Sequence, residues 1–337
     1  MEVARRELEA AGWKLGVLDR SLAYPAHHRV TKGKVRGTLY GVAIGDALGA
    51  PNEGRRPWRI REPVTGLRPH RGHPAGTVTD DTELTLALAE SLLERGGFDP
   101  EDLAKRFVLR GARMVGGGRA TRAALSRLAA GEPWWRAGTP SAGNGAAMRA
   151  SPVGLFFEAA DEARRVAFFQ GLLTHRDRSA LAGAIVNALL VGALARGARP
   201  EPKLLGWLVE AIRGLEVPLE SRLRPGWRYT LAEALEELPE YIGKPEQAFR
   251  RYGLGAFVLE TLPSALALFL SHPEDPETAL LTAANAGFDA DTLASLVGGW
   301  LGAHLGDRGL RSRTPSNWWA VNAAPEIERL SKLAIGG

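Results

Sequence analysis

Apolar residues recur with the period of an α-helix along most of this 337-residue chain. After Asp80, one stripe with i, i+3, i+4, i+7, i+8 spacing consists of Leu84, Ala87, Leu88, Ser91 and Leu92. A second stripe, formed by Leu86, Ala89 and Leu93, makes most sides of this segment apolar and predicts a largely buried helix. The segment after Asp291 repeats the pattern with Leu293, Leu296, Val297, Trp300 and Leu301.

The same periodicity predicts further helices over residues 34–49, 99–113, 119–130, 161–173, 178–196, 201–214, 256–270, 276–286 and 318–333. No segment alternates apolar and polar residues as a half-buried strand does, and there is no βαβ rhythm. Glycine and proline mark the clearest loops, at 50–78, 131–146 and 215–228. The pattern therefore predicts an all-α fold.

The composition does not change in a way that would divide the chain into two large domains. We expect residues 1–32 to form an N-terminal extension, a helix plus a linker, and residues 33–337 to form one compact many-helix domain. In the segment after Asp291, Gly298, Gly299 and Gly302 would let a neighbouring helix approach closely, at some cost in helix propensity.

Composition also narrows the class of protein. There is no Cys, which excludes disulfides and thiolate metal sites. The first residues, MEVARRELEAAGWKLG, lack the apolar stretch of a secretory signal. The most apolar run, Leu181–Ala195, contains Asn187 and is expected to be too short to span a bilayer. We therefore expect a cytoplasmic, monomeric protein with no membrane partner.

The charge balance is basic. The formal net charge is +5, and the 43 basic residues comprise seven Lys and 36 Arg. Arginine suits bidentate contacts to phosphate, but a GC-rich genome would produce the same bias. The charge therefore leaves a nucleic-acid partner open without establishing one.

Two acidic motifs, more than 200 residues apart, precede the two strongest helical patterns. One is Thr79-Asp80-Asp81-Thr82, and the other is Asp289-Ala290-Asp291-Thr292. Such residues can simply cap a helix, and Asp80 with Glu83 fits a capping box. One helix start needs only one cap, however, so paired acids at two starts exceed that need. Brought together, the carboxylates and hydroxyls would form an all-oxygen site suited to Mg²⁺ or Mn²⁺.

Glu53 is a further candidate, at the end of the stretch GDALGAPNE. It precedes a loop rich in arginine, with Arg55, Arg56, Arg59, Arg61, Arg68 and Arg71. A carboxylate in these surroundings is either a solvated ion-pair partner or a site residue.

Two glycine-rich segments and one histidine complete the set. In Ser141–Arg149, SAGNGAAMR, glycines free the backbone to point successive N–H groups at an anion. The segment Gly116-Gly117-Gly118-Arg119 is a weaker candidate of the same kind. His175, in the motif THRD at the end of a predicted helix, is either a site residue or only a partner of the helix dipole.

Taken together, these motifs resemble those of the ADP-ribosylglycohydrolases, which include the dinitrogenase reductase-activating glycohydrolase type. The resemblance runs from about Gly33 to Gly306 and is carried, in the family's order, by GDALGAPNE, TVTDDTELTLALAESLL, SAGNGAAMRASPVGL, THRD and AGFDADTLASLVGGWLGAHLG. It implies an all-α fold and a site for two metal ions, Mg²⁺ or Mn²⁺. It also implies hydrolysis of the N- or O-glycosidic bond at C1″ of ADP-ribose attached to Arg, Ser, an acyl group or another acceptor.

The resemblance further implies roles for individual residues. The metal ions would be held by Thr79, Asp80, Asp81, Asp289, Asp291 and Thr292. Glu53 would be a metal ligand or a proton-transfer group at the substrate edge. Substrate would be bound by Ser141, Gly143 and Asn144 at the pyrophosphate, by His175 at a ribose, and by Gly117 in the second glycine-rich segment.

The chain departs from the family in two places. Phe288 stands where many relatives have glycine before the second acidic motif. Arginine-directed relatives often carry an acid just before the Gly-x-Thr-Thr segment, whereas this chain reads Met114-Val115-Gly116-Gly117-Gly118-Arg119-Ala120-Thr121. Arginine as the acceptor is therefore not implied.

We predict a dinuclear metal-dependent hydrolase that reverses ADP-ribosylation, with Glu53 moving a proton for water or for the leaving group. One alternative is a catalytically idle member that binds ADP-ribose or serves structurally, although the complete ligand set argues against it. The other is a nucleic-acid-directed protein, favoured by the loop Arg55–Arg71 and a pI of about 9.7. The two ideas combine if the substrate is ADP-ribosylated DNA or RNA.

Overall fold

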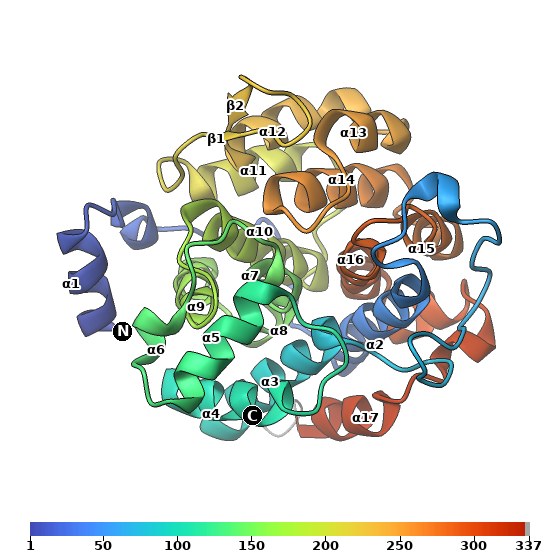
Figure 1. Ribbon diagram of the computed structural model, residues 1–337, viewed down its shortest axis with the longest axis horizontal. Coiled ribbons are helices and arrows are strands. Elements are labelled where there is room, and N and C mark those ends of the chain that lie inside the picture. The colour runs from blue at the N-terminus through green and yellow to red at the C-terminus, as the bar shows by residue number, and fades with distance from the viewer. Residues whose placement is uncertain (334–337) are drawn as a thin grey trace.

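Helices supply nearly all the regular structure of the protein (Figure 1). The computed structural model describes residues 1–333. Its α-helices are α1 (Glu2–Ala10), α2 (Lys32–Gly49), α3 (Asp80–Arg95), α4 (Pro100–Gly111), α5 (Arg119–Ala129), α6 (Trp134–Ala137), α7 (Gly145–Met148), α8 (Ser151–Phe156), α9 (Ala160–Leu172), α10 (Arg178–Ala195), α11 (Lys203–Ile212), α12 (Leu231–Glu237), α13 (Pro245–Tyr252), α14 (Val258–Ser271), α15 (Pro276–Ala284), α16 (Ala290–Arg311) and α17 (Ala324–Leu333). The all-α fold that periodicity predicts is confirmed.

The remaining regular elements are short. The 3-10 turns are η1 (Gly16–Asp19), η2 (Ala50–Asn52), η3 (Pro57–Arg59), η4 (Leu238–Tyr241) and η5 (Ser316–Trp319). In the described residues, the one sheet is the antiparallel pair β1 (Leu219–Glu220) and β2 (Arg228–Tyr229). Each strand has two residues, which is too short for an alternating pattern to be visible in the sequence.

Each expected helix has a counterpart, and the differences have local causes. The helix predicted over 318–333 is divided, because the segment between η5 and α17 bonds instead to the loop between α2 and α3. Asn322 N donates to Gly76 O over 3.0 Å, and Val78 N donates to Asn322 Oδ1 over 3.1 Å. The predicted loop 131–146 contains α6, and α7, α8, α12 and α13 were not predicted. None of these exceeds eight residues, so the apolar period has little room to repeat.

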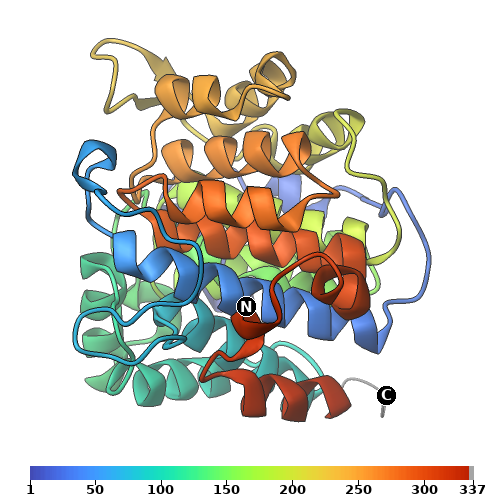
Figure 2. The same cartoon turned by 90° about the vertical axis from the view of Figure 1, so that its right-hand side faces the viewer.

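Helices α2 and α16 make the most extensive helix–helix contact in the described part of the chain. Figure 1 looks nearly along both axes, and Figure 2 shows blue α2 lengthwise beneath red-orange α16. A methyl group at Gly41 would lie 1.9 Å from Gly298 O, so only glycine fits there. The close approach predicted for Gly298 and Gly302 is confirmed. At the other end of the contact, a methyl group at Gly49 would lie 2.3 Å from Ala290 O, so α2 ends against the first turn of α16.

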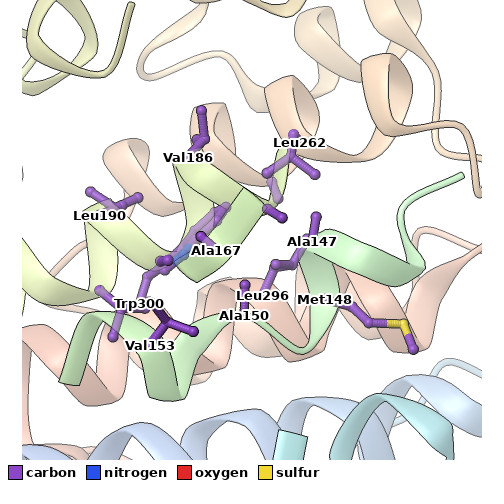
Figure 3. Close-up of a cluster of buried hydrophobic side chains, with 14 of the residues drawn as sticks. Ala147, Met148, Ala150, Val153, Ala167, Val186, Leu190, Leu262, Leu296 and Trp300 are labelled. Carbon is purple, nitrogen blue, oxygen red and sulfur yellow. The ribbon is translucent and has the colours of Figure 1, made fainter. Parts of the chain in front are cut away.

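Helix α10 runs through the hydrophobic core. Figure 3 shows its Val186 and Leu190 among side chains from five other helices, which include Ala147, Met148, Val153, Ala167, Leu262, Leu296 and Trp300. The polar Asn187 is satisfied there, because Trp300 Nε1 donates to its Oδ1 over 2.8 Å. Helix α10 extends the stretch Leu181–Ala195 at its N-terminal end to 18 residues, and the whole helix is long and apolar enough to cross a membrane by length and composition alone. In this fold 94% of it is buried, as in the core helix of a globular domain.

The N-terminal residues lie against the helical body. Leu8, Leu15 and Leu18 are buried, and Glu7 forms an ion pair with Arg136 of α6 over 2.8 Å. The division into residues 1–32 and 33–337 stays a prediction, and residues 334–337 of the second range lie outside the described residues.

Candidate metal and substrate site

The starts of α3 and α16 meet at one place in the fold. Thr292 Oγ1, in the first turn of α16, donates to Asp81 Oδ2, in the first turn of α3, over 3.2 Å. Helix α2 holds both starts, because Gly49 contacts the first turn of α16 while Asp46 bonds to the first turn of α3. Two motifs that are distant in sequence therefore form one acidic cluster.

Asp46 caps α3 from a different helix. Its carboxylate accepts hydrogen bonds from Thr79 N (2.9 Å), Thr79 Oγ1 (2.8 Å), Thr82 N (3.1 Å) and Thr82 Oγ1 (2.5 Å). The predicted cap by Thr79 or Asp80 is therefore wrong, as no side chain within α3 caps it. The predicted capping box is wrong too, because Glu83 pairs with Arg110 over 2.8 Å. Since Asp46 satisfies the helix start, the carboxylates of Asp80 and Asp81 are left for another partner.

The acids of the cluster are crowded, and Asp80, Asp81 and Asp291 are buried while Glu53 and Asp289 are partly exposed. Single carboxylate oxygens of Glu53, Asp289 and Asp291 all lie within 4.8 Å of one another. Burial, reinforced by the neighbouring carboxylates, raises the pKa of Asp80 and of Asp289 to about 7. The same causes raise the pKa values of Asp81 and Asp291 well above their usual range. Such crowding is unfavourable for ionised carboxylates unless a proton or a cation neutralises them.

Two buried carboxylate oxygens without a hydrogen-bond partner indicate whether a cation fits this cluster. Asp81 Oδ1 and Asp291 Oδ1 are buried and have no hydrogen-bond partner. Buried carboxylate oxygens without a donor are costly, and a cation would satisfy them. The surrounding groups are carboxylates and hydroxyls, which are the ligands that Mg²⁺ and Mn²⁺ prefer. The residues present therefore fit hard divalent cations.

Glu53 lies at the edge of this cluster, directly after η2. Its carboxylate is half-buried, forms an ion pair with Arg71 over 2.8 Å and lies near Asp289 and Asp291. The ion pair expected from the sequence is present, and a role in the site stays a prediction. The backbone around it is tied to the start of α16, because Gly54 N donates to Phe288 O over 2.6 Å and Phe288 N donates to Arg55 O over 2.7 Å. Phe288 adopts a φ of +54° in this bridge, a conformation that glycine adopts more readily, and its side chain is exposed.

The loop Ser141–Asn144 joins the acidic cluster through Asn144. Its side-chain Nδ2 donates to Asp289 Oδ2 and, over 2.9 Å, to Thr261 Oγ1. The backbone amides also have acceptors within the protein, since Gly143 N donates to Ser141 Oγ (3.2 Å) and Asn144 N donates to Ala256 O (3.0 Å). The predicted outward-facing row of amides is therefore wrong at these two residues. Asn144 instead holds the carboxylate of Asp289.

His175 is buried beside the same loop. A methyl group added at Gly145 would lie 2.8 Å from its Cε1, and one at Gly143 would lie 3.2 Å from its Nε2. Burial and the nearby charge of Arg149 lower the pKa of His175 to about 3, so the imidazole is neutral. Its position at the end of α9 is not that of a charged dipole partner. Asp177 of the same motif caps α10 by accepting from Ser179 N and Ala180 N.

The second glycine-rich segment also reaches the cluster. Gly117 N donates to Asp80 Oδ1 over 2.7 Å, and the φ values of Gly116 and Gly117 are +83° and +97°. From the sequence, Gly117 was predicted to contact the substrate. In the structure, its amide donates to the carboxylate of Asp80. Sequence reasoning gave no role to Asp46 or Thr261, and it named Arg71 only among the arginines of the loop. Of these, only Asp46 carried a usable signal, as an acid on the apolar face of a predicted helix.

A separate cavity lies elsewhere in the molecule. It has a volume of about 760 Å³, and its lining includes His28, Leu39, Leu92, Phe156 and Arg196 but none of the acids described above. This cavity is therefore separate from the acidic cluster.

Comparison with known proteins bears on what the cluster does. The family model described as ADP-ribosylglycohydrolase matches residues 28–335. An uncharacterized protein of Archaeoglobus fulgidus is 33% identical over 281 residues, covering 80% of this chain and 87% of its own. The ADP-ribosylhydrolase ARH3 of Mus musculus is 29% identical over 325 residues, covering 85% and 86%.

A solved structure gives the same likeness in three dimensions. A chain titled ADP-ribosylglycohydrolase-related protein complex superposes with a TM-score of 0.72 at 33% sequence identity. The match covers 90% of this chain and 97% of that one.

Proposed function

The chain belongs to the ADP-ribosylglycohydrolase family, and from that premise we propose that it is a metal-dependent hydrolase that removes ADP-ribose from an acceptor. The observation that carries the proposal is the meeting of two acidic helix starts with Glu53 around the unpartnered oxygens of Asp81 and Asp291.

The proposed ligands of two Mg²⁺ or Mn²⁺ ions are Thr79, Asp80, Asp81, Asp289, Asp291 and Thr292. Ions bound there would supply Lewis-acid polarisation of substrate oxygens. Asp46 supports these ligands by fixing the first turn of α3, and Asn144 supports them by donating to Asp289.

Glu53 is the proposed proton-transfer residue. Hydrolysis adds water across the bond between C1″ and the acceptor, so water must lose a proton and the acceptor must gain one. Glycosidic bonds cleave through an oxocarbenium-like state, and a carboxylate at the edge of the cluster can move that proton. The ion pair with Arg71 fixes the direction of the Glu53 side chain.

The proposed substrate contacts are Ser141, Gly143, His175 and Gly117, together with Asn144. His175 is well suited to a neutral hydrogen bond because it is uncharged and faces this loop. These residues approach the carboxylates from the side of Asp289 and Asp80, which fits a ligand that bridges the loop and the acidic cluster.

Nucleic acid is a second candidate for the acceptor, and a specific surface favours it. Trp58 is 71% exposed in the loop after Glu53, with the guanidinium of Arg56 over its ring at 5.5 Å from the centroid. Within the described residues, no acidic partner pairs with Arg55, Arg56, Arg59 or Arg61. Exposed aromatic rings among free cations are typical of surfaces that bind single-stranded nucleic acid.

A panel of ADP-ribosylated substrates tests the proposal. ADP-ribose release would be measured from Arg-, Ser-, acyl- and nucleic-acid-linked ADP-ribose, with protein freed of metal by chelator and then supplied with Mg²⁺ or Mn²⁺. We expect release from at least one linkage, only with the cation. Full activity of the chelator-treated protein would contradict the metal requirement. Binding of ADP-ribose with no release from any linkage would identify an idle member.

A further inference from the structure

Arg149 is a fully buried arginine that forms no ion pair with a carboxylate in residues 1–333, although the charge of Asp80 lies near enough to favour its charged form. Its guanidinium donates to Gln170 Oε1 (2.9 Å), Gln170 O (3.0 Å), Gly145 O (3.0 Å) and Thr174 Oγ1 (2.8 Å). Burying a cation without an ion-pair partner is costly, even when most of its donors are satisfied. An arginine in such a place, directly behind the loop of the proposed substrate site, calls for a reason beyond packing.

The chemistry of these groups fixes the direction of each hydrogen bond. A guanidinium only donates, so Thr174 Oγ1 must accept from Arg149. The single proton of the Thr174 hydroxyl is then free to point elsewhere, and His175 Nδ1 lies 2.8 Å away. Thr174 therefore donates to Nδ1, which must carry a lone pair. In a neutral imidazole the proton then resides on Nε2.

Gln170 supports this assignment. Its Oε1 accepts from Arg149, which leaves its Nε2 as the donor, and that nitrogen lies 3.0 Å from Ala146 O and 3.1 Å from Ala167 O. Both acceptors are carbonyls, so the whole network agrees with one set of directions. Arg149 is the group from which these directions follow, since it cannot accept.

The proton on His175 Nε2 is directed toward the loop. Nε2 would lie 3.2 Å from a methyl group at Gly143, and Ser141 Oγ would lie 3.3 Å from the same point. Among the described residues, Nε2 forms no hydrogen bond to a protein acceptor. The imidazole thus presents a donor with no partner to the space beside Ser141 and Gly143.

We propose that Arg149 and Thr174 are positioning residues that hold His175 in the Nε2–H tautomer, so that it donates to an oxygen of ADP-ribose. The inference rests on the proposed function for the identity of the ligand. Phosphate oxygens and ribose hydroxyls both accept such a bond, whereas the opposite tautomer would present a lone pair that repels a phosphate oxygen. The Thr174 hydroxyl thus strengthens binding through His175 and not by a contact of its own with the ligand.

The pair Thr174→Val and Thr174→Ser tests this directly. Valine keeps the shape and removes the hydroxyl, and serine restores the hydroxyl. Nitrogen-15 NMR of the full-length protein distinguishes protonated from bare imidazole nitrogens, and His175→Asn assigns the His175 signals among the seven histidines. We expect Nε2–H with bare Nδ1 in the wild type and in Thr174→Ser, and a mixture of tautomers in Thr174→Val.

Binding supplies a second, independent readout by calorimetry with ADP-ribose, ADP and adenosine. Loss of one hydrogen bond should weaken ADP-ribose binding about tenfold in Thr174→Val, and Thr174→Ser should recover it. Weakening of ADP-ribose and ADP but not adenosine would place the bonded oxygen on the phosphates. Weaker binding of all three ligands would place the bonded oxygen on the adenosine ribose. Weaker binding of ADP-ribose alone would place it on the distal ribose.

Different results would overturn this proposal and the proposed function on which it rests. A proton on Nδ1 in the wild type would overturn the proposal, as would a Thr174→Val protein with unchanged tautomer and unchanged affinity. A wild type with the expected tautomer that binds none of the three ligands would instead contradict the proposed function. Arg149→Lys should also give mixed tautomers if that variant folds. If it does not fold, Thr174→Val still decides the test.

Discussion

The acidic cluster and the arginine loop of residues 50–78 adjoin at Glu53, yet they are built in opposite ways. In the cluster, Asp81 and Asp291 are almost fully buried at helix starts, held by Asp46 and by the α2–α16 contact. In the loop, which runs along the outer edge of the molecule beside α15, Trp58 is 71% exposed (Figure 1). The cluster is packed and suited to chemistry, whereas the loop is open to contact with a partner, which under the proposed function would be the acceptor of ADP-ribose.

The largest effect should come from removing cluster carboxylates. Asp80→Ala and Asp291→Ala should each lower turnover by more than about 100-fold, because each removes a proposed cation ligand. The double variant should lose little more, since residues that act as one unit are not additive. Steady-state ADP-ribose release measures this, with the exposed Glu246→Ala as a control. Independent, multiplying losses would indicate two separate sites.

Glu53 joins the two regions, and its substitution should separate chemistry from binding. Glu53→Gln keeps the size and removes the basicity, so the rate should fall by about 10²–10⁴-fold while ADP-ribose still binds. Single-turnover rates and calorimetry measure the two effects. A loss smaller than about tenfold would assign Glu53 to the loop, as an ion-pair partner of Arg71 and nothing more.

The rigidity of the cluster depends on the glycine contact beneath it. Gly41→Ala should destabilise the protein by about 3 kcal/mol, since the new methyl group would overlap Gly298 O at 1.9 Å. Gly206→Ala is the matched control, because that glycine is also helical and has no atom within 4 Å of the added methyl group. The control should be neutral or stabilising. Equal denaturation midpoints for the two variants would show that the helices separate at little cost.

The smallest effect should come from the loop. Neutralising Arg56, Arg59 and Arg61 together should change turnover on an ADP-ribosylated peptide less than about threefold, because exposed charges steer weakly. ADP-ribosylated DNA and RNA, assayed at two salt concentrations, decide the role of the loop. A larger loss on them that shrinks at high salt supports a nucleic-acid acceptor. An equal, small loss on all three would make the loop ordinary solvated surface, and neutralised Arg6, Lys105 and Arg250 provide the control.

The sequence alone predicted the features that depend on a repeating pattern or on adjacent residues. The apolar period predicted the long helices, and the two acidic motifs could be identified because each occupies adjacent residues at a helix start. The cap of α3 could not be predicted in the same way, because Asp46 lies 33 residues before Thr79 and its acceptor role exists only after α2 and α3 pack. Short helices such as α7 were missed because four residues cannot show a period.

The loop Ser141–Asn144 shows the same limit more sharply. Glycines in Ser141–Arg149 predicted outward-facing amides, but a backbone amide turns toward whichever acceptor the fold supplies. Ala256 O and Ser141 Oγ supply those acceptors. The contacts from Asn144 to Asp289 and from Arg149 to Thr174 likewise depend on packing, so the residue types were visible in the sequence while their partners were not.

Thermal unfolding with and without cation tests most directly whether the two helix starts form one cation site. Metal-free protein and its Asp291→Ala variant would be melted with and without saturating Mg²⁺ or Mn²⁺. A ligand at about 100 times its Kd stabilises the native state by about 2.7 kcal/mol, so the wild type should melt at a higher temperature with the cation, and the variant should not. An unchanged melting temperature of the wild type, or an equal rise in the variant, would contradict the account.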